Sequence, residues 1–106
     1  MTAANEISHE RLTALKNMGL VMTALGSVTR QRILMLLQEK QAIPTNEIAD
    51  HFNLSRTAVV HHLGVLRDAG VVKPNGSEET IWVDWKLIAD TLGTAHAWVA
   101  PLAEAQ

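Results

Sequence analysis

The sequence predicts a mainly α-helical domain with a small β-hairpin, and two observations support this fold class. Between about residues 45 and 69, two short helical patterns are separated by a turn of about three residues, which is typical of a helix-turn-helix. At about residues 71–83 the apolar period changes to two around an Asn-Gly pair, the strongest short signal for a hairpin. A hairpin that directly follows a helix-turn-helix is a wing, so the expected fold is a winged helix-turn-helix.

Length and composition indicate a single folded domain over residues 1–106. The chain is 47% hydrophobic and 19% charged, which is typical of a globular protein. It contains no cysteine, which excludes disulfides, thiolate metal sites and cysteine nucleophiles. We find no apolar run of ~18 residues and no signal-peptide pattern, so we expect a cytoplasmic protein without a membrane partner.

The first helix is expected at about residues 5–25, where apolar side chains recur every three or four positions. Gly26 is expected to end this helix in the left-handed conformation. Ser27 can then cap a second helix that runs to about Gln38, and residues 42–44 break the pattern.

The helix-turn-helix comes next. Thr45 is expected to cap a short helix over residues 46–52, and Asn53 to adopt the left-handed conformation of a tight turn. Ser55 is expected to cap the following helix, which runs from residue 56 to about residue 68.

The wing begins after Gly70, which is expected to end the preceding helix. Its two strands are expected at residues 71–73 and 80–83, where β-branched and aromatic side chains are concentrated. Residues 74–77 supply the turn between them.

The terminal helices, at about residues 5–25 and 85–100, are expected to join two subunits. The second of them carries an apolar seam with steps of four and three positions: Ile88, Leu92, Ala95, Val99 and Leu102. The first terminal helix has a similar apolar stripe. A domain of this size has too little core to cover both stripes, and we therefore expect a homodimer. The alternative is that both helices only cover their own core. Pro101 is expected to kink or end the last helix.

A helical wheel of residues 56–68 separates a core face from an outward face. The core face holds Val59, Leu63 and Leu66. His62 also points inward, and we interpret it as a structural histidine whose ring nitrogens form hydrogen bonds within the protein. The outward face carries side chains that can contact DNA. They are Thr57, Val60, His61 and Arg67, joined by Arg56 at the edge of this face in the first turn, where the chain is not yet packed.

The first residues of such a helix can reach base edges in the major groove. Arg56 can donate two hydrogen bonds to guanine, and Thr57 and His61 can bond to bases or phosphate. Val60 can touch a thymine methyl group. Ser55, beside the helix start, and Lys73, in the wing, complete the expected DNA-binding residues. The alternative is that this face is merely solvated.

Two segments place the chain near a known family. The run ALGSVTRQRIL at residues 24–34 resembles the ALSDPTRLRIL segment of the ArsR/SmtB family of bacterial winged-helix repressors. LSRTAVVHHL at 54–63 resembles the recognition-helix motif of that family, which LRDAGVV at 66–72 continues. The resemblance covers about residues 12–100, nearly the whole domain. It implies a homodimer that binds double-stranded DNA at an inverted-repeat operator, blocks transcription and is released by an inducer. It also places the base contacts on Arg56, Thr57, Val60 and His61.

The chain departs from that family in two places. Many members have Ser where this chain has Val60, which replaces a hydrogen bond with an apolar contact. The wing tip, usually basic, is acidic here (Glu78, Glu79), and Lys73 is the only obvious wing cation. Phosphate contacts are then expected from other cations. They are Arg30, Arg32 and Lys40.

Charge alone does not favour nucleic acid, because the net charge is −2. Residues 30–73 hold six Lys and Arg against four Asp and Glu, whereas residues 74–106 hold one against five. A competing hypothesis is therefore a winged-helix module that binds a protein through its acidic wing and does not bind DNA.

The signals for a regulatory site are weak. The family's metal-binding pattern on the last helix is incomplete: Asp84 and His96 are present, Lys86 replaces a second ligand and Val99 a fourth. Adding His9 from a partner would give only a scattered set, so we expect no metal, no other cofactor and no catalysis. The tryptophans either anchor packing, which we favour, or line a ligand pocket at the dimer interface. They are Trp82, Trp85 and Trp98.

Overall fold

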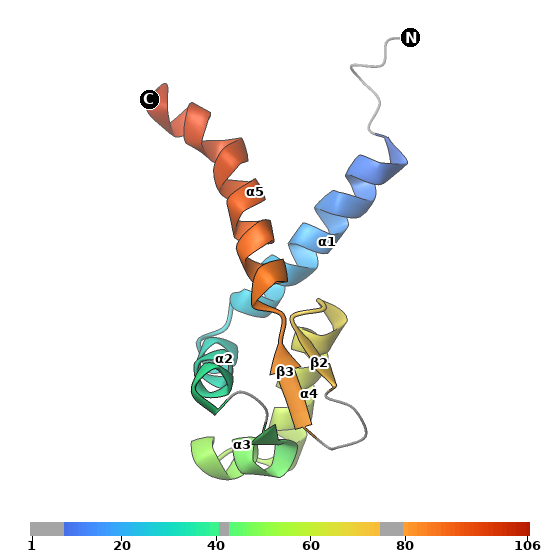
Figure 1. The fold of residues 1–106 in the computed structure, drawn as a ribbon, viewed down its shortest axis with the longest axis vertical. Coiled ribbons are helices and arrows are strands. Elements are labelled where there is room, and N and C mark those ends of the chain that lie inside the picture. Colours follow the sequence, from blue (N-terminus) through green and yellow to red (C-terminus); the bar gives the residue numbers. More distant parts are fainter. Residues whose placement is uncertain (1–7, 41–42, 75–79) are drawn as a thin grey trace.

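The computed structural model describes residues 8–40, 43–74 and 80–106, which form five helices and one three-stranded sheet (Figure 1). In chain order the elements are α1 (His9–Leu25), α2 (Val28–Lys40), β1 (Ile43–Pro44), α3 (Thr45–Phe52), α4 (Arg56–Asp68), β2 (Val72–Pro74), β3 (Thr80–Val83) and α5 (Trp85–Glu104). This order confirms the predicted winged helix-turn-helix.

The core lies where α2, α3 and α4 meet the sheet. Its largest fully buried side chains come from these elements and the start of the wing: Ile33, Leu37, Ile48, Leu66, Val59, Val71 and Val72, joined by Val21 of α1. From this body α1 and α5 project as two diverging arms, and the C-terminus lies at the far tip of the α5 arm (Figure 1). The molecule is therefore elongated, 55 × 31 × 21 Å.

The sheet has one more strand than the predicted hairpin. Strand β1 pairs antiparallel with β3, and Ile43 lies opposite Ile81, which gives the order β1-β3-β2. A strand of two residues is too short to show an apolar period, so the sequence indicates only a break there. Strand β3 has its predicted bounds, while β2 is displaced by one residue. The predicted turn at 74–77 falls mostly outside the described residues.

Two predicted helix caps are wrong. Gly26 has φ −82° and ψ 19°, which is not left-handed. Thr45 is the first residue of α3, and the cap position belongs to Pro44, without a side-chain hydrogen bond. Among the described residues the left-handed positions are Asn53 (φ 54°), as predicted, and Gly70 (φ 78°).

Much of the apolar surface of the arms stays exposed. On α5 only the first seam residue, Ile88, is buried, while Leu92 and Leu102 are 45% and 62% exposed. On α1, Leu12 and Leu15 are about half exposed as well. The expectation that both helices only cover their own core therefore fails. Helix α5 also continues through Pro101 to Glu104.

The three tryptophans are exposed within this chain. Trp82, Trp85 and Trp98 are 41%, 44% and 66% exposed, so the favoured expectation that they anchor packing is not met inside one subunit. They also do not line the hollow of about 430 Å³ between α1, the end of α4 and α5.

Within the described segments, no helix alone is long and apolar enough to cross a membrane. Helices α1 and α2 reach the required length and hydropathy only together, and they meet at 88°.

Candidate nucleic-acid interface

The turn between α3 and α4 has a fixed geometry. Asn53 is left-handed, and the N–H of Leu54 donates to the carbonyl of Ala49 at 3.0 Å, which closes α3. Two residues later Ser55 Oγ accepts the N–H of Ala58 at 3.1 Å and caps α4. Both ends of the turn are thus defined by local hydrogen bonds, so the start of α4 is held rigidly against α3.

Helix α4 has the two faces that its sequence predicts. Val59, Leu63 and Leu66 are buried in the core. The expected base-contact residues are all exposed, in the first two turns of the helix: Arg56, Thr57, Val60 and His61. Their spacing, i, i+1, i+4 and i+5, places them on one face. A guanidinium, a hydroxyl, an isopropyl group and an imidazole therefore lie together beside the helix N-terminus.

Arg67 lies apart from this group. It follows Arg56 by eleven positions, which corresponds to about 16 Å of helix rise. It is exposed and lines the hollow between the arms, together with Asn17 of α1 and Asp90 of α5. The structure therefore does not bring Arg67 together with the residues at the start of α4.

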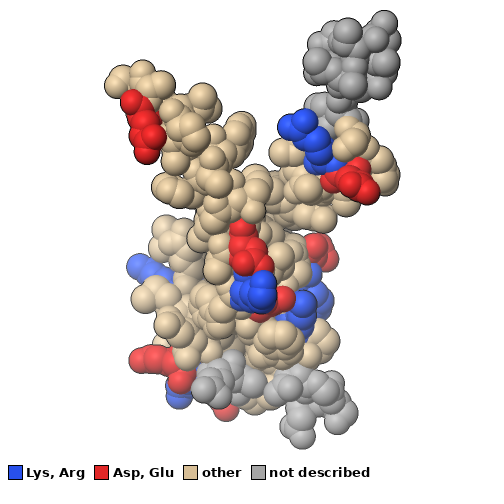
Figure 2. Space-filling model, turned by 45° about the horizontal axis from the view of Figure 1, so that its top comes forward, with Lys and Arg blue, Asp and Glu red and all other residues tan. Residues whose placement is uncertain are grey.

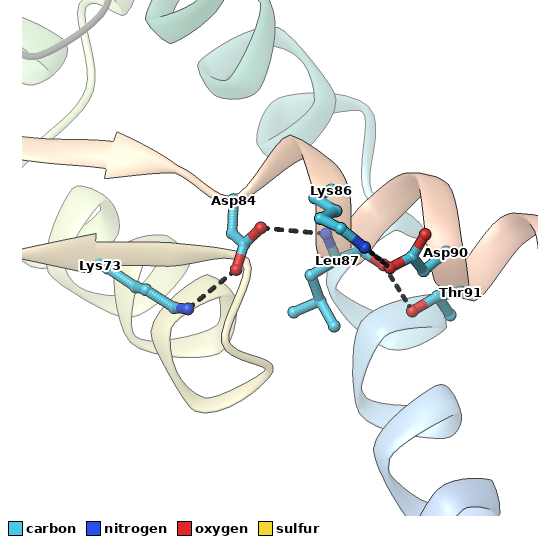
Figure 3. Close-up of polar contacts among 6 residues, drawn as sticks. All are labelled: Lys73, Asp84, Lys86, Leu87, Asp90 and Thr91. Atoms are coloured by element: carbon cyan, nitrogen blue, oxygen red, sulfur yellow. Dashed lines mark hydrogen bonds and ion pairs between the residues drawn. The ribbon is translucent and has the colours of Figure 1, made fainter.

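The wing cation is bound to the protein itself. Lys73 Nζ lies 2.8 Å from Asp84 Oδ2 and 5.6 Å from the centroid of the Trp82 ring (Figure 3 for the ion pair). Asp84 also caps α5, because its Oδ1 accepts the N–H of Leu87 at 3.0 Å. Both hydrogen bonds, with Lys73 first, lower the pKa of Asp84. Lys73 therefore offers DNA a charge that is already partly neutralised.

Arg30 is also engaged within the protein. Its Nε and Nη2 donate to the carbonyls of Ala24 and Thr23 at 2.9 and 3.0 Å, and Nη1 lies 3.3 Å from His62 Nδ1. Both side chains are half-buried, which agrees with the inward direction predicted for His62. The other expected phosphate contacts, Arg32 and Lys40, are exposed on α2.

Sequence reasoning missed this function of Arg30. Its guanidinium reaches carbonyls six and seven positions earlier because α1 and α2 turn sharply at Gly26. The apolar period within one helix gives no information about a contact between two helices that meet at a sharp bend. The only available sign was the Ser27 cap, whose Oγ accepts the N–H of Arg30 at 3.3 Å and fixes where α2 begins.

A metal site does not form among the described residues, since no three His, Cys, Asp or Glu side chains gather there. Asp84 is occupied by Lys73, and Lys86 pairs with Asp90 at 2.7 Å (Figure 3). His96 is exposed farther along α5.

Comparison with known proteins gives consistent matches. Residues 27–73 match the family described as bacterial regulatory protein, arsR family. The transcriptional repressor SdpR of Bacillus subtilis (strain 168) is 34% identical over 62 residues, which is 58% of this chain and 68% of SdpR. The uncharacterized HTH-type transcriptional regulator MJ1325 of Methanocaldococcus jannaschii is 31% identical over 70 residues, 66% of this chain and 76% of the relative.

A solved structure also shares the fold. NolR from Sinorhizobium fredii superimposes with a TM-score of 0.62 at 22% identity, covering 88% of this chain and 94% of NolR. At this identity the likeness shows the architecture alone.

Proposed function

We propose that this chain, which belongs to the ArsR family of bacterial regulatory proteins and is a DNA-binding transcriptional regulator, acts as a dimeric repressor at an inverted-repeat operator. The observation that carries the proposal is the group of exposed side chains at the capped start of α4. They are Arg56, Thr57, Val60 and His61.

These four side chains have the chemistry to read a major groove. Arg56 can donate to guanine O6 and N7 in a bidentate contact, and Val60, 63% exposed, can meet a thymine methyl group. Thr57 and His61 can bond to bases or to the flanking phosphates. Ser55 and the free N–H groups at the start of α4 favour a phosphate beside them. Repression is the role we assign because SdpR is named a transcriptional repressor.

The two arms are the proposed dimer interface. Residues 17–29 and 91–103 contain no Lys, Arg, Asp or Glu, and the arm formed by α5 is mainly uncharged in Figure 2. Exposed apolar side chains follow both arms: Leu12, Leu15, Leu20, Met22, Leu92, Trp98, Val99 and Leu102. An exposed apolar surface of this extent is typical of an interface. A second copy would cover it and would give the tryptophans of α5 a packing partner.

Selection of bound DNA from a random pool tests the proposal. We expect enrichment of an inverted repeat with half-sites about one helical turn, ~34 Å, apart, bound by one dimer. The promoter of the protein's own gene is the first natural fragment to test. Binding that is equal for every sequence in the pool would contradict an operator-specific repressor.

The bound state of Lys73 favours a second candidate, a wing that contacts a protein. With Lys73 paired to Asp84, the acidic residues 78 and 79 dominate the wing charge. Under this candidate the purified protein retains no promoter DNA at low salt, whereas the repressor does.

We also propose that any inducer acts without thiol chemistry, since the chain has no cysteine. A preformed complex of the protein with the selected operator is used to find which compounds release the DNA. Metal ions and metabolites are added to it, and release of the DNA is followed by fluorescence anisotropy. The alternative is a repressor that acts without an inducer, and release by any of these compounds would contradict it.

A further inference from the structure

One guanidinium connects three helices at the base of α1. Arg30 belongs to α2, its Nε and Nη2 bind the last carbonyls of α1, and its Nη1 contacts His62 of α4 at 3.3 Å. Helix α1 belongs to the proposed dimer interface, while α4 carries the proposed base contacts. The contact therefore connects these two surfaces, in addition to the direct packing of α1 against α4.

The contact requires one protonation state of His62. A guanidinium has only donors, so Nδ1 must present a lone pair, and the ring proton of a neutral imidazole then lies on Nε2. Burial lowers the pKa of His62, and the charges of Arg30 and His61 lower it further. The charged or titratable groups facing His62 are Arg30 from α2 and His61 from α4, while α1 contributes its carbonyls through Arg30.

His62 directly follows His61 along α4, and their ring centroids are 5.4 Å apart. Neighbouring Val59 and Leu63 attach α4 to the core, but apolar packing alone allows small rotations that a directed hydrogen bond does not. The imidazole of His61, which faces the groove in the proposed complex, therefore lies directly beside the ring of His62.

We infer that His62 is a positioning residue for DNA binding: through Arg30 it holds the recognition helix at a fixed angle to the α1–α2 corner. This inference rests on the proposed function. Protonation of Nδ1 removes the acceptor and places two cations together, so the contact is lost in acid.

The experiment compares His62→Ala, His62→Asn and Gln31→Ala, each with circular dichroism to confirm the fold. Asn keeps an acceptor near the position of Nδ1 but does not titrate. Gln31 is the matched control: its Nε2 donates to the carbonyl of Leu25 at 2.7 Å on the same corner, and among the described residues its side chain makes no hydrogen bond to α4. Affinity for the selected operator is measured from pH 5.5 to 8.

At pH 8 we expect His62→Ala to weaken operator binding about three- to tenfold, while His62→Asn and Gln31→Ala stay near wild type. As the pH falls below 6.5, the wild type should lose affinity relative to His62→Asn, because the pKa of His62 lies below that value. Equal losses in Ala and Asn variants, or a loss in Gln31→Ala as large as in His62→Ala, would overturn the positioning role.

A measurement without DNA separates this inference from the proposed function. Nitrogen-15 NMR of the free protein should show His62 Nδ1 unprotonated at neutral pH, and Arg30→Ala should raise the pKa of His62 by removing the neighbouring charge. If the pKa does not rise, the Arg30–His62 contact is refuted. If these results hold and no operator is found, the proposed function has failed while the contact stands.

Discussion

Two cations of this chain, Arg30 and Lys73, are bound by the protein's own carbonyl, imidazole and carboxylate groups. Arg56 is different, because it is exposed in the first turn of α4 beside a capped helix start. The Arg56 guanidinium is not held by a hydrogen bond or ion pair within the described residues, so bound DNA can orient it. At the scale of single residues, sequence discrimination is therefore expected to depend most on Arg56.

Replacing Arg56 with Ala should weaken binding to the selected operator by ~1–3 kcal/mol and relax the base preference at one position of each half-site. Random DNA should lose much less, because phosphate contacts remain. Competition binding against both DNAs measures the difference. Lys40→Ala is the comparison, since an exposed cation that meets only phosphate should weaken both DNAs equally; an equal loss for Arg56→Ala would assign it the same phosphate role.

Residue roles were predictable where they follow from helix periodicity. Val59 is buried and Val60 exposed, as the wheel requires, since one turn of helix decides both. The Lys73–Asp84 pair was not predictable, because it joins β2 to the residue that follows β3, and their proximity depends on the register of the two strands. The same limit applies to Arg30 and His62, which are 32 positions apart.

At the scale of elements, the arms present more apolar surface than one subunit can cover. Leu92→Glu on α5 should yield a monomer in analytical ultracentrifugation with unchanged helix content, because Leu92 is 45% exposed within the chain. Binding to the inverted repeat should fall with it, since two linked half-site contacts become independent.

The control for that substitution is Met35→Glu on α2. Met35 is more exposed, at 66%, but lies outside both arms. It should leave the dimer intact. A dimeric Leu92→Glu variant would show that α5 is not the interface.

The link between α4 and the wing depends on Gly70. Its φ is +78°, and an added Cβ would meet Leu87 Cδ2 at 3.3 Å. Gly70→Ala should destabilise the fold by ~1–2 kcal/mol because an L-residue is strained there. Gly64→Ala, in the helix interior with open space around its Cβ, should stabilise by ~0.5–1 kcal/mol. Urea unfolding measures the change in the free energy of unfolding for both variants. If Gly70→Ala is as stable as the wild type, the backbone relaxes at this position.

Most element bounds follow from local chemistry, and the exceptions have a common cause. Ser27 and Ser55 cap α2 and α4 as expected, because their hydroxyls bind amides three residues away. Strand β1 exists only through its pairing with β3, and the end of α1 depends on side chains from α2. Elements completed by a distant partner are not visible in a local pattern.

At the scale of the whole molecule, DNA binding must work against a net charge of −2. We therefore expect phosphate contact to depend on a few exposed cations in the middle of the chain. We expect log affinity to fall linearly with log salt, with a slope of about −0.9 for each phosphate neutralised. Titrations at ~50 to 200 mM salt measure it. An affinity independent of salt would exclude phosphate binding altogether.

Between β3 and α5 there is a single residue, Asp84, whose N–H also binds the carbonyl of Val71 at 2.8 Å. Strand β3 of the wing and helix α5 are consequently joined without a flexible linker. A second subunit or a small molecule that tilts α5 would therefore also move β2 and β3. The single linking residue cannot absorb such a tilt.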